Sequence, residues 1–226
     1  MERVPLTGKV LSENERVAAS LRVRFAEHGV LCLNLVSSPG SGKTSLLERT
    51  LESLPHGERV AVLTGDIQTE NDAARLRRFG FPVEQITTGG TCHLDARMIE
   101  RGLGKWRLED IDLLFIENVG NLVCPASYDL GEAAKIVVLS VTEGEDKPLK
   151  YPAMFFKSEL LVLNKTDLLP YVPFEIDRAA ENARRVHPGM EIVRLSCLTG
   201  DGLGSWLEWL DQKKQSFRRA TAEALT

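Results

Sequence analysis

The sequence predicts an α/β protein built on a mostly parallel sheet with helices on both faces. Three observations lead to this fold class. Apolar runs of strand length alternate with stretches of helical periodicity along the chain. The longest runs are almost continuously apolar, which is typical of strands that are covered on both faces. Polar clusters follow the carboxyl ends of several runs, where sheets of this kind bind ligands.

The individual elements follow from the same patterns. A leading helix is expected over about residues 12–28, where Ser12 and Glu15 have the spelling of a capping box. Strands are expected over residues 31–36, 58–66, 82–86, 111–121, 135–148, 158–169 and 190–196. Further helices are expected over residues 44–53, 71–80, 87–102 (after a glycine-rich turn), 175–186 and 202–218. No internal repeat, low-complexity segment or long linker interrupts this order, so residues 1–226 are expected to form one domain.

Composition and charge argue against several classes of partner. The chain has 226 residues and a formal net charge of −4, with a sequence pI of about 5.7, so no global field attracts nucleic acid or an anionic membrane. No apolar run approaches the roughly 20 residues of a membrane span, and no secretory signal is recognised at the start. We therefore expect a cytoplasmic protein with neither nucleic acid nor membrane as a partner. Its four cysteines are too few and too dispersed for a disulfide scaffold.

The first strand leads into a break with the chemistry of a phosphate-binding loop. Residues 37–45 read SSPGSGKTS, with Ser37 where the strict G-x-x-x-x-G-K-[ST] motif has glycine. Small residues let backbone N–H groups converge on a phosphate, and the following helix adds its positive dipole end. Lys43 is expected to contact the β- and γ-phosphates and Thr44 to bind Mg²⁺. The alternative is an ordinary turn. The predicted phosphate-loop residues are Ser38, Pro39, Gly40, Ser41, Gly42, Lys43, Thr44 and Ser45.

A second motif concerns the base of the nucleotide. Asn164, Lys165 and Asp167 belong to the sequence NKTD, which follows a predicted strand. A carboxylate there accepts hydrogen bonds from N1–H and the exocyclic amine of guanine, whereas adenine lacks this donor pair and leaves the carboxylate unpaired. The alternative is a simple helix cap. Ser196 and Cys197 follow the next strand, where a further base-contacting loop is expected. The sequence therefore favours GTP over ATP.

Carboxylates at the ends of two strands are candidates for catalysis. Phosphoryl transfer needs Mg²⁺ near the β- and γ-oxygens and a group that orients water. Glu117 is expected to bind Mg²⁺, and Gly120 to offer its N–H to the γ-phosphate. Asp66 is expected to hold the attacking water or a Mg²⁺-bound water, with Asp72 as second choice; each acid has the alternative role of a capping or solvated carboxylate. The predicted catalytic set is Lys43, Asp66, Glu117 and Gly120, and the predicted Mg²⁺ ligands are Thr44, Asp66 and Glu117.

A third cluster has the chemistry of a soft-metal site. Cys92 and His93 are adjacent near a predicted helix start, which would favour the thiolate, and Cys124 follows 31 residues after His93. Two sulfurs and an imidazole suit Ni²⁺ or Zn²⁺, and three protein ligands leave one position open. The alternative is that these cysteines are inert packing, as we expect for Cys32 inside the first strand.

These motifs together resemble the HypB family of hydrogenase nickel-incorporation GTPases, which are P-loop NTPases of the SIMIBI type. The resemblance covers nearly the whole chain; the most specific pieces are GTCHLDA and ENVGNLVCP, and VTEGEDKPLKYP and SCLTG occur in the same order. It implies a GTP-hydrolysing metallochaperone that forms a nucleotide-dependent homodimer, with Cys92, His93 and Cys124 binding Ni²⁺ or Zn²⁺ at the interface. It also implies two partners, a HypA-type zinc-binding nickel chaperone and the precursor of the [NiFe]-hydrogenase large subunit.

Other functions stay open at this stage. The urease accessory GTPase is similar in fold and loops, but its metal motif is Cys-Pro-His, whereas Cys92 and His93 are contiguous here. A regulatory GTPase without a transition-metal role, and a small-molecule kinase, are further alternatives. Within the metallochaperone hypothesis, Glu117 lies only seven residues before Cys124, so ordering of the Glu117–Gly120 segment by GTP and Mg²⁺ is expected to move a metal ligand.

Overall fold

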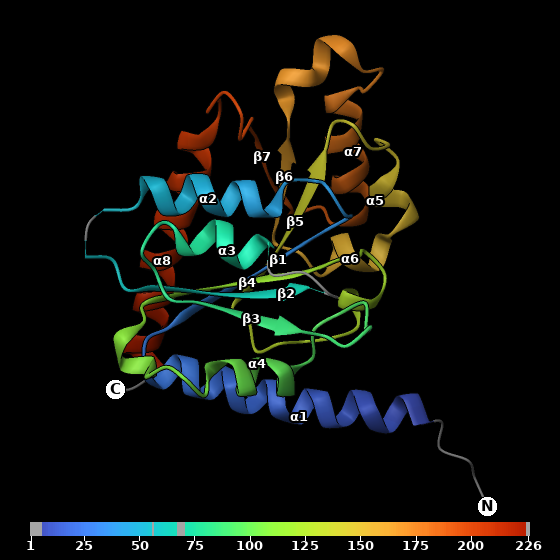
Figure 1. Cartoon of the computed structure of the whole chain (residues 1–226). Helices are drawn as coiled ribbons and strands as arrows, with labels where there is room; N and C mark the ends of the chain where they lie inside the picture. The colour runs from blue at the N-terminus through green and yellow to red at the C-terminus, as the bar shows by residue number, and fades with distance from the viewer. Residues whose placement is uncertain (1–5, 56, 67–70, 225–226) are drawn as a thin grey trace, which may run out of the picture.

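A parallel sheet of seven strands forms the centre of the computed structural model, which describes residues 6–55, 57–66 and 71–224 (Figure 1). The strand order is β3-β2-β4-β1-β5-β6-β7, and every neighbouring pair is parallel. The predicted α/β fold class is confirmed. The strands are β1 (Leu31–Ser37), β2 (Val60–Asp66), β3 (Val83–Thr87), β4 (Leu113–Gly120), β5 (Ala134–Ser140), β6 (Leu160–Asn164) and β7 (Glu191–Arg194).

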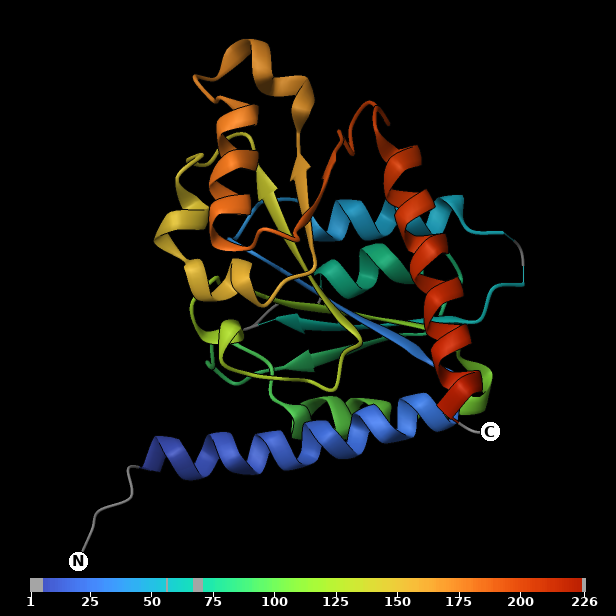
Figure 2. The ribbon, with the colours of Figure 1, turned by 180° about the vertical axis from the view of Figure 1, so that it is seen from behind.

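Helices cover both faces of this sheet (Figures 1 and 2). One face packs against α2, α3 and α8, and the other against α1 and α4 at one end and α6 and α7 at the other. None of the helices in the described part of the chain combines the length and apolarity of a membrane span. The helices are α1 (Leu6–Glu27), α2 (Lys43–Ser53), α3 (Asn71–Arg77), α4 (Ala96–Leu103), α5 (Lys147–Lys150), α6 (Pro152–Phe156), α7 (Ile176–Val186) and α8 (Leu203–Ala224), with short 3₁₀ turns η1 (Leu108–Asp110), η2 (Cys124–Ala126) and η3 (Thr166–Tyr171).

The core follows the two-residue alternation of the strands. Leu31, Leu33 and Leu35 of β1 pack in the cluster beneath α2 and α8, while Cys32 packs on the opposite face beneath α1. Cys32 is buried there, as its position inside an apolar strand predicts. On this opposite face the apolar residues form two separate clusters. Asn34, fully buried in β1, lies on the same face and carries a polar group into the core.

The start of the leading helix differs from the prediction. Helix α1 begins at Leu6 and continues through Ser12, so the predicted capping box of Ser12 and Glu15 is wrong. A helix that extends upstream supplies backbone carbonyls for the N–H groups that such a box would satisfy, and the pattern then has no capping role.

Two predicted strands are too long. The strand predicted over 135–148 ends at Ser140, and the strand predicted over 158–169 ends at Asn164. In both cases a side chain bonds the backbone where the strand ends: the carboxylate of Glu143, in the turn, accepts from the N–H of Ser140, and the Asn164 amide oxygen accepts from the N–H of Lys165. These local bonds compete with strand pairing and turn the chain at the carboxyl edge of the sheet.

Candidate nucleotide and metal site

The loop between β1 and α2 is held in a conformation that depends on its glycines. Gly42 has φ of +101°, and a Cβ there would collide with the side-chain amide of Asn164. Lys43 begins α2, and its ammonium donates to the Ser37 hydroxyl at 2.8 Å. Ser37, which departs from the strict motif, therefore supplies a resting partner for the lysine that glycine could not supply.

A cavity of about 480 Å³ lies beside this loop and brings together the predicted phosphate and acid residues. Its wall includes Arg75, which the sequence reasoning missed although it lies one helical turn after Asp72. A Cβ on Gly120 would lie 2.9 Å from the Pro39 Cα, so the close approach of β4 to the loop requires glycine at this position. The other lining residues include Gly40, Gly42, Lys43, Thr44, Asp66 and Glu117.

The chemistry of this cavity fits Mg²⁺. The Thr44 hydroxyl donates to Glu117 Oε1 at 2.7 Å, and Glu117 is only 4% exposed. Its other oxygen, Oε2, is buried without a hydrogen-bond partner among the described residues. Burial raises the pKa of Glu117 to about 7, and burial also lowers the pKa of Lys43. A hydroxyl and a carboxylate with an uncommitted oxygen, beside Asp66, form the oxygen-rich donor set that Mg²⁺ prefers.

The predicted base-binding residues gather around a second cavity of about 760 Å³. The Asn164 amide donates to the Ser41 carbonyl at 2.9 Å, and its oxygen accepts from Cys197 N–H at 3.3 Å. Lys165 reaches back to the Gly40 carbonyl at 2.7 Å, from a left-handed backbone conformation. Asn164 thus ties the phosphate loop to both base loops. Lys165, Asp167, Cys197 and Leu198 line the cavity itself.

Ser196 lies in the loop after β7, behind the wall of the base cavity. It is fully buried, and its hydroxyl donates to the Asp167 carboxylate instead of lining the cavity. The end of β7 points this side chain back toward η3, so Ser196 orients the carboxylate that faces the base cavity. Nucleotide binding by Ser196 stays a prediction.

The segment after β5 also braces the phosphate loop, which the sequence reasoning did not predict. Glu143 accepts from the Ser41 hydroxyl at 2.7 Å, and Lys147 donates to the Ser38 hydroxyl at 3.2 Å. The two side chains form an ion pair at 3.3 Å. The sequence feature that could have indicated these contacts is the polar segment VTEGEDK at the end of a predicted strand, to which no role was assigned.

The predicted soft-metal residues converge in space. Cys92 and His93 lie in the loop before α4, and Cys124 is the first residue of η2. The Cys92 and Cys124 sulfurs are 2.9 Å apart, and Cys92 Sγ lies 3.9 Å from His93 Nδ1. One ligand atom from each residue lies within 4.8 Å of the others, all three side chains are partly exposed, and both cysteines are free thiols. This set can hold one soft ion and leave a position open.

Local electrostatics prepare the imidazole rather than the thiols. Burial lowers the pKa of His93, which keeps its ring neutral near pH 7 and able to bind a metal. The ring stacks on Tyr128 with 3.8 Å between centroids. The hydrogen bond shared with Cys92, followed by burial, raises the pKa of the Cys124 thiol. Helix α4 begins at Ala96, and Asp95 caps it by accepting from Met98 N–H, so Cys92 lies three residues before the cap.

A glycine-shaped phosphate loop, a lysine at the helix start, a threonine–carboxylate pair and a base cavity define a P-loop nucleotide-binding protein. Residues 31–194 match the family model described as CobW/HypB/UreG, nucleotide-binding domain. The chain is 54% identical over 218 residues to the hydrogenase maturation factor HypB of Azotobacter vinelandii, and the match covers 96% of this chain and 71% of that protein. The chain belongs to the HypB family.

Solved structures of family members have the same fold. The crystal structure of HypB from Helicobacter pylori in complex with nickel is 41% identical, with a TM-score of 0.85, and the match covers 90% of this chain and 96% of that one. The crystal structure of hydrogenase maturation factor HypB from Archaeoglobus fulgidus is 39% identical, with a TM-score of 0.84, and the match covers 90% and 99%. The predicted P-loop NTPase fold is therefore confirmed.

Proposed function

We propose that this protein is a GTP-hydrolysing metallochaperone that binds nickel or zinc and assists nickel insertion during [NiFe]-hydrogenase maturation. The observation that carries the proposal is the convergence of Cys92, His93 and Cys124 within 4.8 Å, with Cys124 four residues after Gly120, which lines the phosphate cavity. Relatives named hydrogenase maturation factors, and a nickel complex of one of them, support the same function.

Guanine specificity rests on the second cavity. Asp167 is held by the Ser196 hydroxyl at its wall, so its carboxylate has a defined orientation toward an incoming base. Guanine satisfies such a carboxylate with two donors, and adenine leaves it without the matching pair. The backbone N–H of Cys197 is committed to Asn164, which keeps this loop in place.

Hydrolysis uses residues that already face the phosphate cavity. Lys43 leaves the Ser37 hydroxyl to contact the β- and γ-phosphates, and the Gly120 N–H donates to the γ-phosphate. Thr44, Glu117 and Asp66 would hold Mg²⁺, which neutralises phosphate charge when bound. Asp66, which lines the same cavity, orients the attacking water, and Asp72 is the second choice for this role.

Metal release is coupled to the nucleotide in this proposal. GTP and Mg²⁺ order the segment from Glu117 to Gly120, and hydrolysis releases it and weakens the site that includes Cys124. Two subunits would share the metal cluster in a nucleotide-dependent homodimer. A HypA-type zinc-binding chaperone and the hydrogenase large-subunit precursor are the proposed partners, and the cytoplasm is the proposed location.

Nickel titration of the full chain tests this function. We expect Cys92→Ala and Cys124→Ala to abolish the tight nickel site, and His28→Gln, at a histidine outside the cluster, to leave it intact. GTP should be hydrolysed in preference to ATP, with Asp167→Ala removing the preference. Unaltered nickel affinity in both cysteine variants would instead favour a regulatory GTPase without a transition-metal role.

A further inference from the structure

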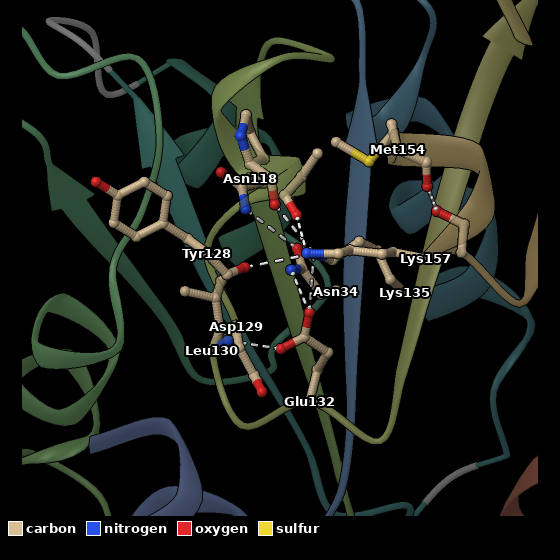
Figure 3. A network of polar contacts seen from close by, with 12 residues as sticks. Asn34, Asn118, Tyr128, Asp129, Leu130, Glu132, Lys135, Met154 and Lys157 are labelled. Atoms are coloured by element: carbon tan, nitrogen blue, oxygen red, sulfur yellow. Dashed lines mark hydrogen bonds and ion pairs between the residues drawn. The ribbon is translucent and has the colours of Figure 1, made fainter. Parts of the chain in front are cut away.

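A network of buried polar side chains crosses the sheet between the two apolar clusters that face α1, α4, α6 and α7 (Figure 3). The Asn118 amide of β4 donates to Asn34 Oδ1 of β1 at 3.3 Å, and the Asn34 amide donates to Glu132 Oε1 at 3.0 Å. Glu132 forms an ion pair at 3.4 Å with Lys135 of β5, and the two side chains are 8% and 6% exposed. The network thus links three neighbouring strands.

Lys135 connects this network to the loop that carries a metal ligand. Its ammonium donates to the carbonyls of Pro125 at 3.0 Å and Tyr128 at 3.3 Å (Figure 3). Pro125 directly follows Cys124, and the ring of Tyr128 stacks on His93. Lys135 therefore holds the backbone that positions one ligand and the aromatic ring that supports another.

Asn118 connects the same network to the other half of the cluster. Its Oδ1 accepts from Leu94 N–H at 3.3 Å, and Leu94 directly follows His93. Successive side chains of a strand point to opposite faces. Glu117 accordingly faces Thr44 and the phosphate cavity, while Asn118 faces the metal-bearing loops. Two consecutive residues of β4 therefore contact the two sites.

Stability alone does not account for such a network. A buried ion pair is often no more stabilising than apolar residues of similar size, and apolar clusters lie on both sides of this one. An ion pair such as that of Lys135 and Glu132, whose charged groups all have hydrogen-bond partners, does fix the position of the surrounding backbone. Any displacement would leave a buried polar group without a partner. The loop at 124–128 is therefore held in one position relative to β4.

We infer that Lys135 and Asn118 are positioning residues of the metal site: Lys135, neutralised by Glu132, holds the Cys124 loop, and Asn118 links that loop and the Leu94 backbone to the strand end that bears Glu117. This inference rests on the proposed function, since it assumes that Cys92, His93 and Cys124 bind metal. The inference adds a second physical connection between the phosphate cavity and the metal site. This connection runs through side chains of β1 and β5, in addition to the short stretch of chain that links Glu117 to Cys124.

The test compares two lysine–glutamate pairs with little side-chain exposure, in the 226-residue chain. Lys135→Met with Glu132→Gln removes both charges of the network. Lys214→Met with Glu58→Gln does the same for a pair at 2.7 Å that joins α8 to the segment before β2, away from the site. Nickel affinity is measured by chelator competition with a GTP analogue and with GDP. The absorption band of thiolate-to-nickel charge transfer is recorded, and unfolding curves establish which variants are folded.

We expect the Lys135/Glu132 variant to lose about 10- to 100-fold in nickel affinity and to shift the charge-transfer band, with the Lys214/Glu58 variant unchanged in both. Asn118→Leu should bring the ratio of the two nickel affinities, with GTP analogue and with GDP, close to one, while Asn182→Leu, at a buried asparagine on α7, keeps the wild-type ratio. If Lys135→Met with Glu132→Gln is unfolded, Lys135→Arg, which keeps the charge, replaces it and should retain more affinity than Lys135→Gln.

A folded Lys135/Glu132 variant with wild-type affinity and spectrum would overturn the role of Lys135, and a wild-type ratio in Asn118→Leu would overturn that of Asn118. Failure of the proposed function has a different signature. In that case Cys124→Ala would bind nickel like the wild type, or the wild type itself would show equal nickel affinity with both nucleotides. Wild-type nickel binding by Cys124→Ala would overturn both proposals. Equal nickel affinity of the wild type with the two nucleotides would overturn only the coupling between nucleotide and metal, and the Lys135/Glu132 variant would still decide whether Lys135 affects nickel affinity.

Discussion

The nucleotide site and the metal cluster are built in opposite ways. Lys43, Thr44 and Glu117 are buried, lie on a helix start and a strand end, and bond to one another or to the loop. Cys92, His93 and Cys124 are partly exposed and lie on two loops 32 residues apart. The first site is preformed by regular elements, whereas the second depends on what holds its loops. Such an arrangement suits a nucleotide that must be held in one orientation for hydrolysis and an ion that enters and leaves.

The largest expected effect tests how far the buried site depends on a single charge. Lys43→Ala should lower the rate of GTP hydrolysis roughly 100- to 1,000-fold, because it removes a preorganised cation from the phosphates. Single-turnover hydrolysis with saturating GTP measures this loss. Lys105→Ala, at an exposed lysine paired with Glu84, is the matched control and should hydrolyse GTP at the wild-type rate. A decrease of less than tenfold in Lys43→Ala would contradict the assigned role.

Because Glu117 is buried, we also predict that the free energy of unfolding depends on pH. Below pH 4.5 the carboxyl is protonated in both states; between 4.5 and about 7 it ionises in the unfolded chain but not in the folded one. The protein without metal and nucleotide should therefore lose stability as pH rises, by on the order of 3 kcal/mol above pH 7. Denaturant titrations of wild type and Glu117→Gln between pH 4.5 and 8 measure this. If the free energies of unfolding of the two proteins changed with pH in the same way, burial would not raise the pKa of Glu117.

Close packing at the phosphate loop sharpens the contrast between the sites. Gly120→Ala places a methyl group against the Pro39 Cα, and we expect it to cost about 1–3 kcal/mol of stability and to weaken GTP binding. Gly204→Ala, in α8 where a Cβ meets nothing within 4 Å, should be neutral or stabilising by about 0.4–1 kcal/mol. Unfolding midpoints and GTP titrations of both variants give the comparison, and equal effects would refute the close-approach argument.

The smallest expected effect lies at the exposed site. Tyr128→Leu removes the ring that stacks on His93, and a stacking contribution of about 0.5–1.5 kcal/mol corresponds to a loss of roughly 2- to 10-fold in nickel affinity. Tyr171→Leu, at a tyrosine that is 81% exposed outside the cluster, is the control. Both are measured without nucleotide. An unchanged affinity in Tyr128→Leu would mean that the ring does not position the imidazole.

Local signals were sufficient for most of the fold. Apolar runs located the five inner strands, because burial on both faces imposes a continuous apolar stretch. The edge strands β3 and β7 were also located, although they are shorter and only partly buried. Strand ends were less predictable. Beyond Ser140 and Asn164 the chain turns through side-chain bonds to its own backbone, and hydropathy does not report such bonds. The predicted start of α1 was wrong for a related reason: the capping-box sequence at Ser12 and Glu15 lies inside a longer helix, where it caps no helix end.

By itself, the sequence determined which residues are candidates to bind phosphate, guanine and a soft metal, because those chemistries depend on residue type and short spacing. Only the tertiary structure decided which of them meet. Cys92 and Cys124 come together because β3, which precedes the Cys92 loop, is separated from β4, which precedes Cys124, only by β2. Lys135 reaches two carbonyls of the metal loop because β5 is separated from β4 only by β1. Contacts between segments distant in the chain depend on strand order and register, and no local pattern encodes them.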